Sequence, residues 1–331
     1  MLGEMMRQPI AVLFALLFTL LIAGCGTPSF LITPVSNTSE LEEITLRPAG
    51  WTAPKIAIVD VEGMLLNAKT GGFLQPQENK VSLFVQELES IAKDSEIKAV
   101  ILRVNSPGGT VTASDIMYEE LLRFKKMTKL PVIVSTQEVT ASGAYYVSCA
   151  ADEIVAEPTS VIGSIGVLFE TFNFTGTMQK IGMSADAIKS GPFKDMGSPF
   201  RPTRPDERAI MQGMVDEYYA RFVAVVNARK KLSPPNEIKA TDGRVFSGVQ
   251  AVDLGLADRV GTLEDAIDVA KQKAGVKSAK IIMFKRPYGY GGSIYASSPL
   301  PPAQSQSMTL DVPGMRNMLP TGFYYLWTPG E

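Results

Sequence analysis

The chain has 331 residues, of which 45% are hydrophobic, and its formal net charge is −2. This length and apolar content suffice for one or two domains with a buried core. The near balance of charges excludes the strongly basic surface of a nucleic-acid-binding protein. Histidine is absent and only two cysteines are present, which argues against a zinc site. We expect no cofactor.

The N-terminal segment has the layout of a secretory signal. Arg7 precedes an apolar run from Ile10 to Ile22, and small residues lead on to Cys25. The run is shorter than the roughly 20 residues that a membrane-spanning helix needs. The sequence Leu-Ile-Ala-Gly-Cys-Gly at 21–26 resembles a bacterial lipoprotein cleavage box, so we expect residues 1–25 to be a lipoprotein-type signal with Cys25 as the lipidated residue. An uncleaved signal anchor is the alternative. Both predict a domain tethered to a bacterial membrane on its extracytoplasmic side.

Two segments of biased composition flank the predicted domain, which we place at residues 54–286. Residues 26–53 are rich in Pro, Thr and Ser and are predicted to be a tether. Residues 287–331 are dominated by Gly, Pro, Ser and Tyr and are predicted to form a tail with little core of its own. The aromatic run Phe323–Trp327 is the exception. We expect it to dock on the domain or on a neighbouring molecule, and the alternative is an apolar tail without a defined contact.

Between these ends, strands and helices alternate along the chain. Buried strands are predicted at 56–61, 99–104, 131–135 and 153–156. Helices are predicted at 79–93, 112–126 and 205–231, directly after Ser142, and from Thr262 to Gly275. Repeated strand-helix units predict a single α/β domain with a parallel sheet, right-handed crossovers and flanking helices. Functional groups are then expected at the junctions between the C-terminal ends of strands and the helices that follow them.

A serine nucleophile is suggested by Ser142, which lies at such a junction. A serine hydroxyl needs a base to take its proton, and the usual imidazole is not available in this chain. Lys194, in a glycine-punctuated loop, is the best remaining candidate for the base. The sequence therefore favours a Ser-Lys hydrolase. Cys149 lies in an apolar helical stretch and is expected to be a small buried residue, not a nucleophile.

Glycines near Ser142 are candidates for an oxyanion hole. Backbone N–H groups of glycine can approach a developing charge without interference from a side chain. The pair Gly108-Gly109 follows a strand and can supply one donor, and Gly143 can supply the other. The alternatives are a tight turn at Pro107–Gly109 and a helix-capping role for Ser142.

A lysine base must be neutral, so its pKa must fall from about 10.4 toward 7 through burial away from carboxylates. Phe193 and Met196 offer apolar cover, but the carboxylate of Asp195 must face away from the amine. A hydroxyl can orient the lysine nitrogen, and Ser164 is the candidate, with a plain turn as the alternative.

Five motifs together resemble the bacterial signal peptide peptidase A family of Ser-Lys serine peptidases over residues 54–275. They are Asn-Ser-Pro-Gly-Gly at 105–109, Thr-Ala-Ser-Gly-Ala-Tyr-Tyr at 140–146, Ile-Gly-Ser-Ile-Gly-Val at 162–167, Lys-Ser-Gly-Pro-Phe-Lys-Asp at 189–195 and Gly-Arg-Val-Phe-Ser-Gly at 243–248. The resemblance implies a Clp protease/crotonase-like α/β fold. It further implies Ser142 as nucleophile, Lys194 as base, Ser164 as the lysine-orienting residue and an oxyanion hole at Gly109 and Gly143.

The same resemblance implies an assembly and a substrate class. Single-domain members form dome-shaped, octameric rings in which serine and lysine come from neighbouring subunits. They cleave remnant signal peptides and other membrane-associated peptides, with a preference for small or apolar side chains. Two other functions stay open at this point: a crotonase-like acyl-ester hydrolase that uses the same oxyanion hole, and a catalytically silent scaffold of the same fold.

Overall fold

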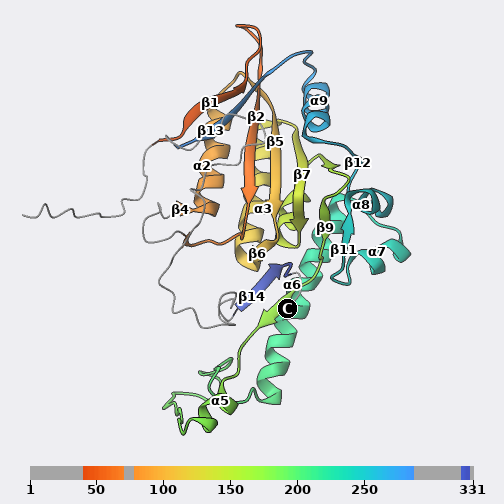
Figure 1. Ribbon diagram of the computed structural model, residues 1–331. Helices are drawn as coiled ribbons and strands as arrows, with labels where there is room; N and C mark the ends of the chain where they lie inside the picture. The colour runs from red at the N-terminus through yellow and green to blue at the C-terminus, as the bar shows by residue number, and fades with distance from the viewer. Residues whose placement is uncertain (1–39, 71–77, 287–321, 329–331) are drawn as a thin grey trace, which may run out of the picture. The chain divides into compact units, whose positions relative to one another are not determined.

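The computed structural model describes residues 40–70, 78–286 and 322–328 (Figure 1). All of these residues belong to one compact unit. The predicted signal sequence and Cys25 lie outside the described residues. Among the residues that are described, no helix combines the length and the apolar character needed to cross a membrane.

A mixed sheet, nine-stranded within the described residues, forms the centre of the unit, and most of its strands are parallel. Along the sheet the order is β1 (Glu42–Arg47), β13 (Lys280–Lys285), β2 (Lys55–Glu62), β5 (Ile97–Ser106), β7 (Val132–Ala141), β8 (Glu153–Ala156) and β12 (Arg259–Val260). Only the β1–β13 pair is antiparallel in this series. The C-terminal end of β7 also pairs with β9 (Val161–Gly163), which in turn pairs with β11 (Val245–Ser247).

Helices cover both faces of this sheet (Figure 1). One face packs against α2 (Lys80–Lys93), α3 (Val111–Thr128), α4 (Gly143–Ser148), α6 (Pro205–Arg229) and α8 (Gly248–Leu254), and the other against α9 (Leu263–Ala274). The strand period of two explains the division, because Ala57 and Val59 face the first layer whereas Ile56 and Ile58 face α9. Two short helices complete the unit, α5 (Thr175–Lys180) and α7 (Pro234–Ala240).

A second, three-stranded sheet lies beside the C-terminal ends of β5 and β7. Its order is β10 (Leu168–Glu170), β14 (Gly322–Leu326) and β6 (Gly108–Thr110), and both pairings are antiparallel. The aromatic run near the C-terminus therefore docks on the domain, which was one of the three alternatives. A two-stranded ribbon of β3 (Lys69–Thr70) and β4 (Glu78–Asn79) precedes α2.

The local elements agree with the sequence expectations, and the ends of the domain differ from them. All four predicted strands and the four long predicted helices are present, and Thr262 and Gly275 cap α9 as expected. Part of the predicted tether, Glu42–Arg47, instead forms strand β1, and part of the predicted tail forms β14. Both strands are held by main-chain pairing with distant segments, which local composition does not reveal.

Candidate active site

Ser142 occupies the sharp turn between β7 and α4 in a strained backbone conformation, with φ 52° and ψ −117°. Its N–H donates to the carbonyl of Gly163 at 2.7 Å, and its own carbonyl accepts from the N–H of Tyr146 at 2.9 Å. Ser142 is only 1% exposed, and although it stands at the N-cap position of α4, its side chain accepts no capping hydrogen bond. The buried Oγ has no hydrogen-bond partner among the described residues.

The strained backbone of Ser142 and its unsatisfied hydroxyl both cost free energy of folding. A residue in a sparsely populated backbone region costs about 1–3 kcal/mol, and an unsatisfied buried polar group costs a similar amount. Such strain clusters at functional sites, and a serine held at a sharp strand-to-helix turn is the arrangement of a nucleophile.

Three glycines line the space beside Ser142 and leave no room for side chains. A Cβ on Gly143 would collide with Ser114 Oγ, and one on Gly109 would collide with the carbonyl oxygen of Leu65. Gly108 has φ 101°, and a Cβ there would lie 2.7 Å from the nitrogen of Gly143. The chain therefore needs glycine at all three positions, and the main chains of β6 and α4 approach each other closely.

The orientation of the Gly109 amide follows from its neighbours in β6. Leu65 donates its N–H to the carbonyl of Gly108 at 2.8 Å and accepts from the N–H of Thr110 at 3.0 Å. Because successive amides of a strand point to opposite sides, the N–H of Gly109 points away from Leu65. Its nitrogen lies 3.2 Å from the position that a Cβ on Gly143 would take. Gly109 and Gly143 thus lie side by side, as an oxyanion hole requires.

Two polar side chains that the sequence reasoning did not single out fix this loop. Ser106 donates its Oγ to the carbonyl of Gly63 at 2.6 Å and accepts from the N–H of Gly108 at 3.1 Å. Asn105 Oδ1 accepts from the N–H of Val139 in β7 at 3.2 Å. Their place in the Asn-Ser-Pro-Gly-Gly motif was the available signal. They position the glycine strand relative to β7, which carries Ser142.

Ser164 lies next to Ser142 because it follows the strand that pairs with the end of β7. Gly163 of β9 is in register with Ala141 of β7, and the two strands are parallel. Ser142 and Ser164 are therefore the next residues after a pair of matched positions. Ser164 also has a positive φ of 51°, is buried, and donates its N–H to the carbonyl of Arg244 at 2.8 Å.

Lys194 is not brought to Ser142 within one chain. It lies in the loop between α5 and α6, where its side chain is exposed and its N–H donates to the carbonyl of Gly191 at 3.2 Å. Ser142 Oγ is buried and has no partner in the described part of the chain. The structure therefore brings Gly109, Gly143, Ser142 and Ser164 together and leaves Lys194 apart from them.

The carboxylate of Asp195 pairs with two basic side chains, and no ion pair between Asp195 and Lys194 is present among the described residues. The Asp195 carboxylate accepts from Lys189 Nζ at 2.7 Å and from Arg201 Nη2 at 2.8 Å. The hydrogen bonds from Arg201 first, and then from Lys189, hold the pKa of Asp195 well below its usual range. Arg201 in turn pairs with the buried Glu207 at the start of α6. This ion-pair network anchors the loop that presents Lys194.

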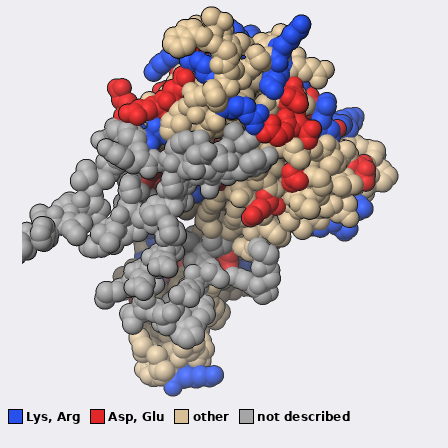
Figure 2. All heavy atoms as spheres, turned by 45° about the horizontal axis from the view of Figure 1, so that its top comes forward, with Lys and Arg blue, Asp and Glu red and all other residues tan. Residues whose placement is uncertain are grey.

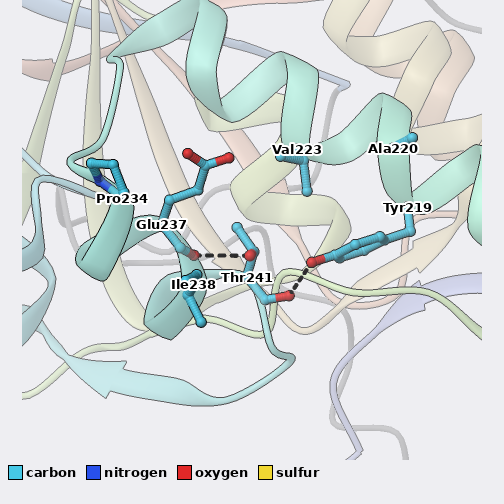
Figure 3. A pocket seen from close by; sticks show the side chains of 7 residues that line it. All are labelled: Tyr219, Ala220, Val223, Pro234, Glu237, Ile238 and Thr241. Atoms are coloured by element: carbon cyan, nitrogen blue, oxygen red, sulfur yellow. Dashed lines mark hydrogen bonds between the residues drawn. The ribbon is translucent and has the colours of Figure 1, made fainter.

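Other features of the described residues lie apart from this cluster. Cys149 is buried, and burial raises the pKa of its thiol to about 12, which makes it a poor nucleophile. A cavity of about 530 Å³ lies between α6 and α7 (Figure 3), lined by Tyr219, Ala220, Val223, Pro234, Glu237, Ile238 and Thr241. None of these is a predicted site residue. On the face in Figure 2, acidic and basic side chains lie side by side.

Known proteins resemble this chain in sequence. The profile of peptidase family S49 matches residues 124–277. A protein of Methanocaldococcus jannaschii named as a protease is 36% identical over 84% of this chain and 86% of its own length. A protein of Enterococcus faecium named as a signal peptide peptidase is 33% identical over 75% of this chain and 72% of its own length. Among solved structures, a membrane-bound stomatin-specific protease is 14% identical, covers 67% of this chain and 84% of its own, and has a TM-score of 0.39.

Proposed function

Since the chain belongs to peptidase family S49 and is a serine peptidase of Clp-like α/β fold, we propose that it is a membrane-tethered endopeptidase that uses a Ser142–Lys194 dyad. The observation that carries the proposal is Ser142 itself. Its hydroxyl is held at a strained turn, has no hydrogen-bond partner among the residues that the structure describes, and lies beside two glycine amides. A structural serine would have satisfied its hydroxyl instead.

The reaction is an acyl transfer in two steps. Ser142 Oγ attacks the carbonyl carbon of the peptide bond while the neutral lysine amine takes the hydroxyl proton. The negative charge that develops on the carbonyl oxygen is stabilised by the N–H groups of Gly109 and Gly143, each worth about 3 kcal/mol of barrier. The lysine ammonium then donates its proton to the leaving amine. Water hydrolyses the acyl-serine with the lysine again as base, and Ser164 orients the lysine nitrogen.

The lysine comes from a neighbouring subunit in this proposal. The segment around Lys194 exposes large apolar side chains, including Ile188, which is fully exposed. The others are Ile181, Met183, Phe193 and Phe200. Clustered exposed apolar side chains mark an interaction surface. A ring of copies, octameric by the resemblance, would cover this surface and carry each Lys194 to the Ser142 of the next subunit.

The substrates we propose are remnant signal peptides and other membrane-associated peptides. The name of the Enterococcus faecium relative supports this class, as does the apolar N-terminal segment that would hold the chain at a membrane through Cys25 or as an anchor. A peptidase fixed at the membrane surface meets such peptides at high local concentration.

A mixing experiment tests the dyad and its division between subunits. Full-length Ser142→Ala and Lys194→Ala chains, each in detergent, should be folded and at least about 1000-fold less active on a reporter peptide. After subunit exchange at equal amounts, about one quarter of the sites should pair an intact serine with an intact lysine, so about one quarter of wild-type activity should return.

The matched control is Lys180→Ala, which removes an exposed lysine at the end of α5 and should leave activity unchanged. If native mass spectrometry verifies mixed oligomers and no activity returns, the shared site is wrong. Full activity of folded Lys194→Ala alone would exclude this lysine as the base.

A further inference from the structure

Glu207 is a carboxylate buried in the first turn of α6. It is the third residue of this helix and is 0% exposed. The segment that carries Lys194 leads into this turn (Figure 1). A helix N-terminus favours a negative charge, and Glu207 Oε2 accepts from the N–H of Arg204 at 3.1 Å. A buried charge is nonetheless unfavourable unless it is paired. The side chains of Arg201 and Arg204 supply the pairing.

Arg201 joins Glu207 to the residue that follows Lys194. Its Nη1 donates to Glu207 Oε2 at 2.9 Å. Its Nε donates to Asp195 Oδ2 at 2.8 Å, and its Nη2 donates to the main-chain carbonyl of Asp195 at 3.0 Å. The contact with the carbonyl holds the main chain as well as the side chain. The main chain directly after Lys194 is therefore tied to the start of α6.

Arg204 joins Glu207 to the two residues that precede Lys194. Its Nη2 lies 3.2 Å from Glu207 Oε1. Its Nη1 donates to the main-chain carbonyl of Pro192 at 3.0 Å, and its guanidinium carbon lies 5.1 Å from the centroid of the Phe193 ring. A cation at this distance from an aromatic face is attracted to the ring. The main chain before Lys194 is therefore held from the same carboxylate.

The charge of Glu207 is what allows one side chain to hold two arginines. The hydrogen bonds from Arg201 lower the pKa of Glu207 to about 2, so this carboxyl group is ionised at neutral pH. The side chain of Lys194 is exposed and lies between the two anchored stretches of main chain. A lysine side chain has many rotamers. The direction in which its amine extends therefore depends on how firmly the main chain beneath it is held.

We propose that Glu207 is a positioning residue for the peptidase reaction: through Arg201 and Arg204 it fixes the main chain on both sides of Lys194 and so aims the amine at Ser142 of the neighbouring subunit. It acts on the reaction only through the lysine. A base displaced by about 1 Å can slow a reaction by about 100-fold. This inference rests on the proposed function, because it takes Lys194 as the base and places it in a shared site.

The test uses mixed oligomers of full-length chains in detergent, in which the two halves of each active site come from different variants. In a mixture of Ser142→Ala and Lys194→Ala chains, the first chain donates the lysine and the second donates the serine. Glu207→Gln is added either to the lysine donor or to the serine donor. Glutamine keeps the size of glutamate but lacks the charge that holds both arginines. The kcat for a reporter peptide is compared with that of the unmodified mixture.

Glu207→Gln in the lysine donor should lower the regained kcat at least about tenfold and leave KM within about twofold, because the amine is no longer aimed. The same change in the serine donor should have no effect, since that chain contributes no lysine to the active pairs. A general disturbance of the subunit would lower kcat in both mixtures. The matched control is Asp216→Asn in the lysine donor, at an exposed carboxylate of α6 that accepts from Gln212, and it should leave kcat unchanged.

Arg204→Gln is the second variant, in case Glu207→Gln does not fold or assemble, as checked by circular dichroism and light scattering. It frees only the Pro192 side of the loop, so kcat should fall about threefold or more, again only in the lysine donor. An unchanged kcat with whichever variant is folded, or an equal loss in both donors, would overturn the proposal. If the unmodified mixture regains no activity, the shared dyad itself is refuted, and the two failures are thereby distinguished.

Discussion

At the scale of single residues, the geometry of the site depends on glycines, which have no side chain. Ser142 has a positive φ, and Gly143 directly after it packs against Ser114 Oγ of α3. The Ser114 hydroxyl is itself held by the carbonyl of Thr110 at 3.0 Å. The backbone amide beside the nucleophile therefore lies where it does because no Cβ separates α4 from α3 and β6.

Gly143→Ala should lower the free energy of unfolding by about 1–3 kcal/mol, since the added methyl group overlaps Ser114 Oγ. Ser114→Ala in the same chain removes that atom and should recover part of the loss. Urea denaturation of the two single variants and the double variant measures the coupling. Strictly additive losses would mean that the overlap with Ser114 is not the cause.

At the scale of elements, two segments depend on partners beyond their own sequence. Strand β14 is held between β6 and β10. The loop from α5 to α6 carries Lys194 on a scaffold of ion pairs through Asp195, Arg201 and Glu207, yet turns apolar side chains outward. An ordered loop with an apolar exterior is the form expected of an interface between subunits.

Ile188→Glu should break the proposed assembly without unfolding the subunit. Ile188 is fully exposed, so a charge there costs little folding free energy in the isolated chain. In an interface the same charge would be buried without a partner, which is unfavourable. We expect a smaller particle in size-exclusion chromatography with light scattering, and loss of peptidase activity. Met127→Glu, at an exposed apolar position of α3, is the control. An unchanged particle size would place the interface elsewhere.

At the scale of the whole unit, a buried cluster of charged side chains lies between strands β2, β5 and β13 of the sheet and helix α2. Asp60 of β2 accepts from Arg103 Nε of β5 at 2.8 Å and from Lys285 Nζ of β13 at 2.7 Å. Glu87 of α2 is buried near this group, and burial raises its pKa to about 8, partly opposed by Lys285 and Arg286. The unit therefore carries a carboxyl group that stays protonated at neutral pH.

This cluster makes stability depend on pH in a defined direction. Between the ordinary glutamate pKa of about 4.3 and the raised pKa of about 8, folded Glu87 keeps a proton that the unfolded chain has released. Stability should then fall as pH rises through this window, by up to about 1.4 kcal/mol per pH unit. Glu87→Gln should flatten the fall, whereas Glu89→Gln on the exposed face of α2 should not. Equal pH slopes in urea denaturation would contradict this assignment.

The sequence by itself determined the elements and much of the site. Val81, Phe84, Leu88 and Ile91 recur at helical spacing and are all buried in α2, because amphipathic periodicity is a local property. The glycine pair and Ser142 could be recognised because the chemistry of acyl transfer needs those residue types at strand ends. The buried state of Cys149 followed from its apolar neighbours.

The tertiary structure alone decided the rest. Strands β1 and β14 pair with segments far away in the chain, and the energy of main-chain pairing depends on the partner, not on a local pattern. The positive φ of Ser142 occurs where its main chain is hydrogen-bonded both to Gly163 of β9 and to Tyr146 of α4, and no local pattern in the sequence predicts it. The separation of Lys194 from Ser142 within one chain is likewise a matter of long-range packing. Sequence motifs name residue types, whereas only packing sets the distances between them.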